Sequence, residues 1–147
     1  MYDLFAAEPL ILERLRQQMT APRLVQGMRD REAVYTRTAV APALYLVCDG
    51  QETRMGAGNE QVVEQAWLVV LAVRNARESD TGRAEREEAG PLLADLARAL
   101  LGWRPGPDHG PLRMAAAPGP AFARGMAFFA LRFVTRLLLR GDGGGGA

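Results

Sequence analysis

The longest apolar run of the chain covers residues 66–73, with the sequence Ala-Trp-Leu-Val-Val-Leu-Ala-Val. A strand that is buried on both faces has this pattern, so we predict that residues 61–75 form the central strand of a sheet. A second apolar run, residues 43–48, is rich in strand-forming residues and is followed by Asp49-Gly50, a turn signal. We expect residues 51–59, which end in Gly-Ala-Gly-Asn, to form the return and tip of a hairpin.

Two segments have helical periodicity. Residues 8–20 carry apolar side chains at three-to-four spacing, Pro9 suits a first helical turn, and Pro22 ends the pattern. Residues 80–103 show a longer apolar face. Pro91 interrupts it, which predicts either a kink or a fresh helix with Pro91 in its first turn.

The segment 126–140 fits both periods, because Arg132, Arg136 and Arg140 share one face of a helix and one face of a strand. Its aromatic and β-branched residues favour a strand. We expect residues 27–32 to be a loop or a single helical turn, and residues 112–117 to be a weak strand. The prediction is a single α+β domain over residues 1–140, with helices packed on one side of a mixed or mainly antiparallel sheet, and a flexible glycine-rich tail over residues 141–147.

Composition narrows the choice of partner only slightly. The 147 residues are 48% hydrophobic and carry 18 basic and 17 acidic side chains, so no global field attracts nucleic acid or an anionic membrane. All the basic residues are Arg. The lone Cys48 lies in an apolar run, where we expect a buried, slowly reacting thiol. The N-terminal residues lack the pattern of a secretion signal and no apolar stretch is long enough to span a bilayer, so we expect a cytoplasmic protein without membrane contact.

No pattern of catalytic or metal-binding residues stands out. His109, the only histidine, lies in a proline-rich loop without a second ligand at metal-binding spacing. Ser79 and Cys48 lack a motif that would place a base beside them. Gly56 and Gly58 lack the third glycine of a dinucleotide fingerprint. We therefore predict no catalytic residue, no cofactor and no metal, and a function that depends on surfaces.

Several stretches, taken in order, resemble the small tail terminator proteins of long-tailed bacteriophages and prophages, particularly the Mu-like group. They are Ala-Glu-Pro-Leu-Ile-Leu-Glu-Arg-Leu near the N-terminus, Pro-Ala-Leu-Tyr-Leu-Val-Cys-Asp-Gly, and the central run from Gln61 to Asn75. Further matches are Arg-Glu-Glu-Ala-Gly-Pro-Leu-Leu from residue 86, Leu-Gly-Trp-Arg-Pro from residue 101, Pro-Leu-Arg from residue 111, and the closing Phe-Val-Thr-Arg. The glycine-rich C-terminus departs from the family pattern.

The resemblance implies a structural virion protein that forms a ring, expected to be a hexamer, at the head-proximal end of the tail tube. Its implied partners are other copies of itself, the tail tube protein and the head-tail connector, with genome DNA passing through the lumen without specific binding. Assembly would take place in the cytoplasm of the host bacterium. We predict that the hairpin and the arginine-bearing strand contact a neighbouring subunit or the tube; the candidate interface residues are Gln51, Glu52, Arg54, Asn59, Arg132 and Arg136.

Two other classes of function stay open at this point. One is a neck or connector adaptor of the same virion, and the other is an unrelated ligand-binding or enzymatic α+β domain. The sequence does not distinguish a contractile from a non-contractile tail.

Overall fold

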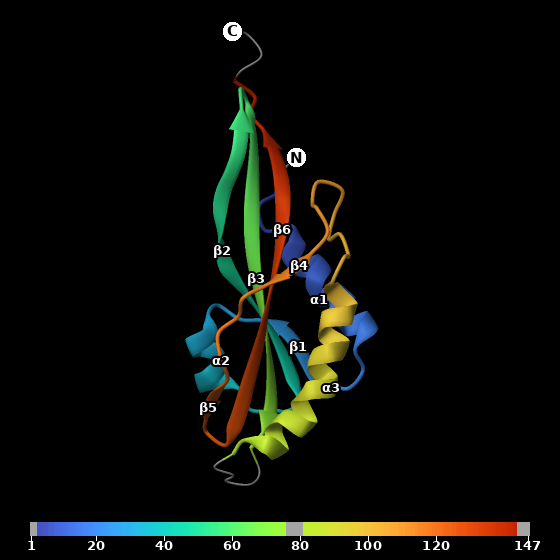
Figure 1. Cartoon of the computed structure of the whole chain (residues 1–147), viewed down its shortest axis with the longest axis vertical. Helices are drawn as coiled ribbons and strands as arrows, with labels where there is room; N and C mark the ends of the chain where they lie inside the picture. Colours follow the sequence, from blue (N-terminus) through green and yellow to red (C-terminus); the bar gives the residue numbers. More distant parts are fainter. Residues whose placement is uncertain (1–2, 76–80, 144–147) are drawn as a thin grey trace.

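Three long strands form the centre of the molecule (Figure 1). A computed structural model describes residues 3–75 and 81–143. Strand β3 (Glu60–Arg74) lies between β2 (Ala43–Ala57) and β6 (Met126–Arg140) and is antiparallel to both. The predicted central strand is confirmed, and the ambiguous segment 126–140 is a strand, as its composition favoured.

Short strands extend this sheet on both sides. β1 (Leu24–Gly27) pairs with β2 in parallel, while β4 (Arg113–Ala115) and β5 (Ala121–Ala123) pair with the outer edge of β6. The strand order is β1-β2-β3-β6-β4, with β5 also on β6. The sheet is therefore mixed and mainly antiparallel, which confirms the predicted α+β fold.

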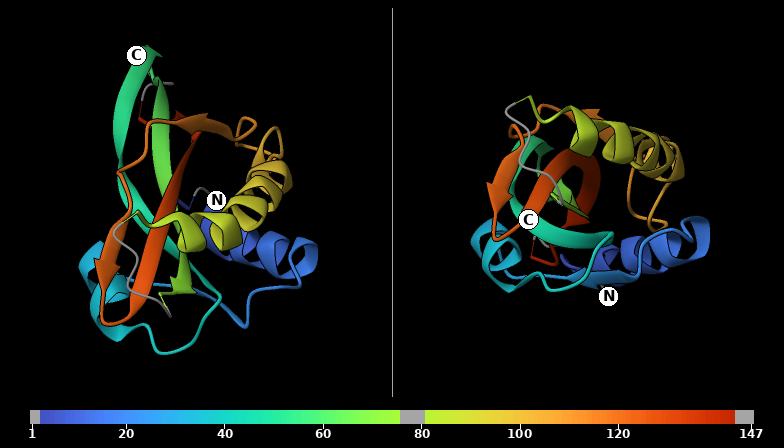
Figure 2. Two further views of the ribbon diagram at one scale, coloured as in Figure 1. Left: turned by 60° about the horizontal axis from the view of Figure 1, so that its bottom comes forward. Right: turned by 90° about the horizontal axis from the view of Figure 1, so that it is seen from below.

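The two long helices, α1 (Ala7–Gln18) and α3 (Arg83–Leu100), share one face of the sheet (Figure 2). The α3 helix continues through Pro91, so the alternative of a fresh helix at that residue is wrong. On this face Trp67, 1% exposed, packs in a core with apolar side chains of both helices. The core on this face includes Ile11, Leu15, Leu46, Val69, Leu96, Leu100 and Phe133.

A third helix, α2 (Arg31–Arg37), packs against the opposite face together with β5 (Figure 2). The carboxylate of Asp30 accepts a hydrogen bond of 2.8 Å from the backbone N–H of Ala33, which caps the helix. Tyr35 contacts Phe128 with ring centroids 5.0 Å apart. The stretch predicted as a loop or single turn thus leads into a complete short helix. Only the two long helices occupy the single side expected from sequence.

The prediction of a turn at Asp49-Gly50 is wrong, because β2 runs on to Ala57. One extra residue of β2 is inserted between the pairs Cys48–Trp67 and Gln51–Gln65, so a β-bulge lies there. Gly50 has φ +96°, which a bulge can require as readily as a turn. The hairpin tip is farther along, where Gly58 has φ +61°. We call the distal part of the three long strands, residues 51–65 and 135–140, the arm; it points away from the helices (Figure 1).

Cys48 is exposed, which contradicts the expected burial. The partner strand β1 reaches only to Gly27, which pairs with Leu46. From that point the outer edge of β2 has no partner strand within the described residues. The apolar run around Cys48 therefore does not indicate burial at its last residue.

Candidate assembly surface

The two faces of the arm differ in what lies against them. On one face, the amide of Gln65 donates a hydrogen bond to the backbone oxygen of Leu4, and the hydroxyl of Thr135 donates to Gly110 at 2.7 Å. Gln65 and Thr135 pair across β3 and β6 and are 3% and 1% exposed. We call this the covered face. The side chains that alternate with them point to the other side, which we call the exposed face.

Glu64 is the centre of the exposed face and accepts hydrogen bonds from arginines of two other strands. Its Oε2 lies 3.1 Å from Nε and 2.5 Å from Nη2 of Arg54 on β2. Its Oε1 accepts from Arg113 of β4 and lies 3.7 Å from Nε of Arg136 on β6. The Glu64 side chain is only 10% exposed. One largely buried carboxylate thus joins three guanidinium groups.

These contacts determine the protonation of the cluster. The hydrogen bond from Arg54 is the largest influence that lowers the pKa of Glu64 below its ordinary value, with the charges of Arg54, Arg113 and Arg136 acting in the same direction against desolvation. The hydrogen bond to Glu64 in turn raises the pKa of Arg54. Glu64 is therefore ionised at neutral pH.

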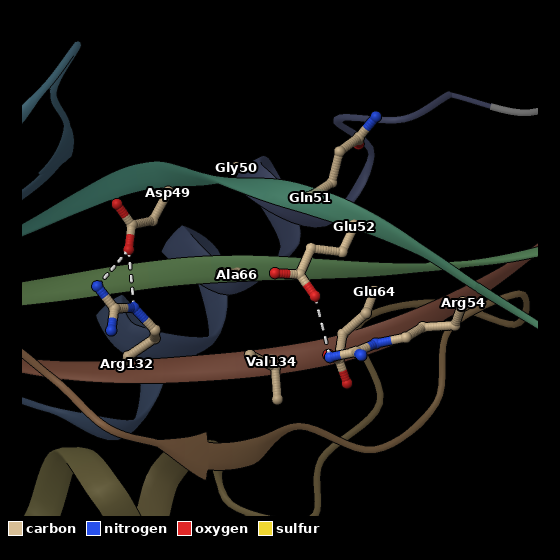
Figure 3. Close-up of a pocket in the computed structure, with 9 residues that line it drawn as sticks. All are labelled: Asp49, Gly50, Gln51, Glu52, Arg54, Glu64, Ala66, Arg132 and Val134. Carbon is tan, nitrogen blue, oxygen red and sulfur yellow. Dashed lines mark hydrogen bonds and ion pairs between the residues drawn. The ribbon is translucent and has the colours of Figure 1, made fainter.

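A second ion pair lies next to this cluster. Both Nε and Nη2 of Arg132 on β6 lie 2.7 Å from Oδ2 of Asp49 on β2. Figure 3 shows this pair and the Glu64 cluster at opposite ends of a shallow pocket of about 390 Å³. The pocket is lined by Asp49, Gly50, Gln51, Glu52, Arg54, Glu64, Ala66, Arg132 and Val134.

The structure brings most of the predicted interface residues together. Gln51, Glu52, Arg54 and Arg132 line this pocket, and Arg136 reaches Glu64 beside it. Asn59 lies apart, at the hairpin tip. Its Nδ2 donates to the backbone oxygen of Gly141 at 2.9 Å, and Gly141 N–H donates back to Asn59 at 2.7 Å. Asn59 therefore ties the hairpin tip to the end of β6.

Sequence reasoning missed Glu64 and Arg113, which belong to the cluster, and Asp49, which holds Arg132. Glu64 is an isolated charge just before the longest apolar run. A charge at that place on a strand is the signal that could have singled out this residue. Its partners follow only from the register of β3 with β6, where Glu64 pairs with Arg136. That register is a tertiary property.

Nearer the tip, the exposed face becomes apolar. Met55 is 75% exposed and Leu138 is 38% exposed, and both line a pocket of about 430 Å³ with Val62 between them on β3. Surface apolar side chains that share one pocket are typical of interaction sites. The exposed face thus combines an apolar pocket with an arginine-rich cluster.

His109 is buried, with 5% exposure, and forms a bridge to Leu137 at the edge of β6. Neither ring nitrogen has a hydrogen-bond partner within the described residues. Burial lowers its pKa, and the charge of Asp108 opposes that shift. Across residues 3–75 and 81–143, no group of three His, Cys, Asp or Glu side chains is placed to hold a metal ion. None of the helices in the same ranges is long and apolar enough to cross a membrane.

Nearly the whole chain matches one known family. Residues 1–143 match the family described as phage tail terminator protein. The chain belongs to the phage tail terminator family. No curated protein matches it.

Membership of the phage tail terminator family assigns a structural role in the phage tail, and with it a place in the virion and association with other tail components. The arm suits such a role because its exposed face offers both apolar and charged contacts. The resemblance seen in the sequence is thereby confirmed at the level of the family.

Proposed function

We propose that this terminator protein forms a ring on the head-proximal end of the tail tube, stops tube polymerisation there and offers the surface on which the head connector docks. The observation that carries the proposal is the family match over residues 1–143. The expected ring is a hexamer. It would assemble in the cytoplasm of the host bacterium, where tube and connector proteins are made.

The arm is the proposed contact region of the ring. Arg136, Arg54 and Glu52 lie on its exposed face, where their side chains are 45–70% exposed and can meet a neighbouring subunit or the tube. Gln51 pairs with Gln65 and therefore lies on the covered face. Arg132 and Asn59 contribute differently, because Arg132 is only 28% exposed in its pair with Asp49 and Asn59 binds Gly141 at the hairpin tip. We propose that these two residues hold the arm in its binding shape.

The near balance of 18 basic and 17 acidic residues supports passage of DNA without specific binding. Arg132 pairs with Asp49, Arg54 with Glu64, and Arg140 lies 3.6 Å from Glu60. Arg132 and Arg140 are each paired with one carboxylate of the same chain, so they attract phosphates less strongly, because that carboxylate repels them. DNA would then pass through the lumen without being bound specifically by the ring.

A tube-growth assay tests the proposal. Tubes polymerised from the tail tube protein of the same phage should stop growing when this chain is added, and electron micrographs should show it at one end. Continued growth with the chain absent from the tube ends would contradict the proposal. Binding at one end without arrest of growth would instead favour the neck or connector adaptor.

A further inference from the structure

The N-terminal turn of this chain has the chemistry that the exposed face of the arm requires. We propose that residues 3–6 of one copy dock on the exposed face of the arm of the next copy, with Phe5 in the pocket between Met55 and Leu138 and Asp3 beside Arg136. This inference rests on the proposed ring and specifies how its subunits meet.

The apolar part of the contact joins two exposed groups. Phe5 is 56% exposed although it is a large aromatic side chain, and Met55 is 75% exposed. Met55 and Leu138 line a pocket of about 430 Å³. Aromatic anchors that fill pockets contribute much of the binding energy at protein interfaces. Burial of Phe5 would remove water from both sides of the contact at once.

The charged part has matching signs. Three arginines surround Glu64, and the side chains of Arg136 and Arg113 are 55% and 53% exposed. Each guanidinium carries five N–H donors, so donors remain for a further acceptor. Asp3 accepts a hydrogen bond of 2.9 Å from the backbone of Phe5 and keeps acceptor capacity.

The charged and the apolar group are neighbours on each side of the proposed contact. Arg136 and Leu138 are two residues apart on the same side of β6, which corresponds to about 7 Å along a strand. Asp3 and Phe5 are also close together, because the carboxylate of Asp3 accepts a hydrogen bond from the backbone N–H of Phe5. One short segment can therefore reach both the charged and the apolar part of the exposed face.

The position of the turn makes the proposed contact one between two different surfaces. Leu4 is bound to Gln65 on the covered face, and the neighbouring residue Glu64 is the centre of the exposed face. The two surfaces that meet therefore lie back to back at the same level of the arm. A contact between two different patches is heterologous, and it closes into a ring when successive copies are rotated without a shift along the axis.

Pairing of strand edges is a poorer alternative. The free outer edge of β2 carries two register shifts, between Cys48 and Gln51 and between Thr53 and Gly56. Bulges of this kind twist an edge away from a further strand and protect it against pairing. Side chains on the face of the arm are then the available contact.

Disulfide trapping tests the inference directly. Phe5→Cys and Leu138→Cys are combined in a Cys48→Ser background and oxidised under conditions in which the wild type forms rings, with purified tail tubes as template. Phe5 and Leu138 belong to opposite faces of one arm, so a bond between them must join two copies. The expected product is a ladder of covalent oligomers, up to the ring. If only dimers form, and Leu138→Cys alone forms them equally well, the exposed faces of two copies meet each other. That result would overturn the inference.

Mixing of two defective variants gives an independent result. Phe5→Asp removes the aromatic side chain of the turn, and Leu138→Asp places a charge in the pocket. Each variant alone should therefore stay monomeric. In an equal mixture, Phe5 of the Leu138→Asp copy can dock in the intact pocket of the Phe5→Asp copy. The measured mass should therefore be that of a dimer. Phe122→Asp is the matched control, because Phe122 is 54% exposed on β5, outside the arm, and should leave assembly unchanged.

Failure of the inference is distinguishable from failure of the proposed function. Rings that form normally with either Asp variant would overturn the docking of residues 3–6 and leave the ring itself standing. A wild-type chain that stays monomeric on purified tubes would remove the ring and the contact together.

Discussion

Arg132 and Asp49 form an ion pair that bridges the two strands on either side of β3. Arg132 lies on β6 and Asp49 on β2, and two guanidinium nitrogens lie 2.7 Å from one carboxylate oxygen. The side chains are 28% and 25% exposed. Asp49 lies at the bulge of β2, so the pair joins the bulged part of β2 to β6 at the base of the arm.

Loss of this pair should weaken the fold measurably. Arg132→Met should reduce the free energy of unfolding by about 1–2 kcal/mol, because a charge-assisted hydrogen bond is lost and a half-buried carboxylate loses its partner. Urea denaturation of Arg132→Met, Asp49→Asn and the double variant measures the coupling. Strictly additive effects would show that the pair contributes nothing to stability.

Glu64→Gln should destabilise the arm more strongly. The substitution leaves three guanidinium groups close together without their central charge, and loss of the hydrogen bonds to the carboxylate should cost about 1.5–3 kcal/mol, because the arginines are about half exposed and stay hydrated. Glu52→Gln is the matched control, since the Glu52 side chain is 70% exposed and should change stability little. Hydrogen exchange of the backbone amides of residues 60–65 provides the local measurement. Equal protection in both variants would contradict the central role of Glu64.

His109 should make stability depend on pH. Its folded pKa lies below the ordinary value of 6.5 because the ring is buried, so the folded state binds its proton less readily than the unfolded chain. The contribution of neutral His109 to the free energy of unfolding is complete above about pH 6.5. It is lost as the pH falls towards the lower pKa of His109 in the folded state. His109→Gln should flatten the unfolding free energy between pH 7 and pH 5, measured in urea. An unchanged slope in the variant would argue against a buried neutral His109.

Below about pH 4.5 protonation of Glu64, whose pKa is lowered, should reduce stability further.

Cys48 should react readily with a thiol reagent in the native protein, because its side chain is exposed on the open edge of β2. The expected labelling rate is close to that of the urea-unfolded chain. Slow labelling of the native monomer would restore the burial that the apolar sequence suggested.

The contrast at Cys48 shows where sequence patterns stop being informative. The run 66–73 predicts a central strand correctly, since continuous apolarity requires cover on both faces, and β3 has it. The run 43–48 has the same appearance, but burial of its end depends on how far β1 extends along β2. That length is set by the partner strand and is invisible in the run itself.

The sequence did not predict the arm, for a related reason. Asp49-Gly50 supplies a left-handed backbone position, which hairpin turns and β-bulges both use. Only the continuous pairing of β2 with β3 distinguishes them. The side chains of the candidate surface were partly predictable, because even spacing placed Arg132 and Arg136 on one face. Their partners Asp49 and Glu64 depend on strand register across β3.

The most direct test of the central claim is an image of the tube ends. Cryo-electron microscopy of purified tail tubes incubated with this chain should show one ring of six subunits at a single end, with the arms of neighbouring subunits in contact. Bare tube ends, or subunits distributed along the tube wall, would contradict the account.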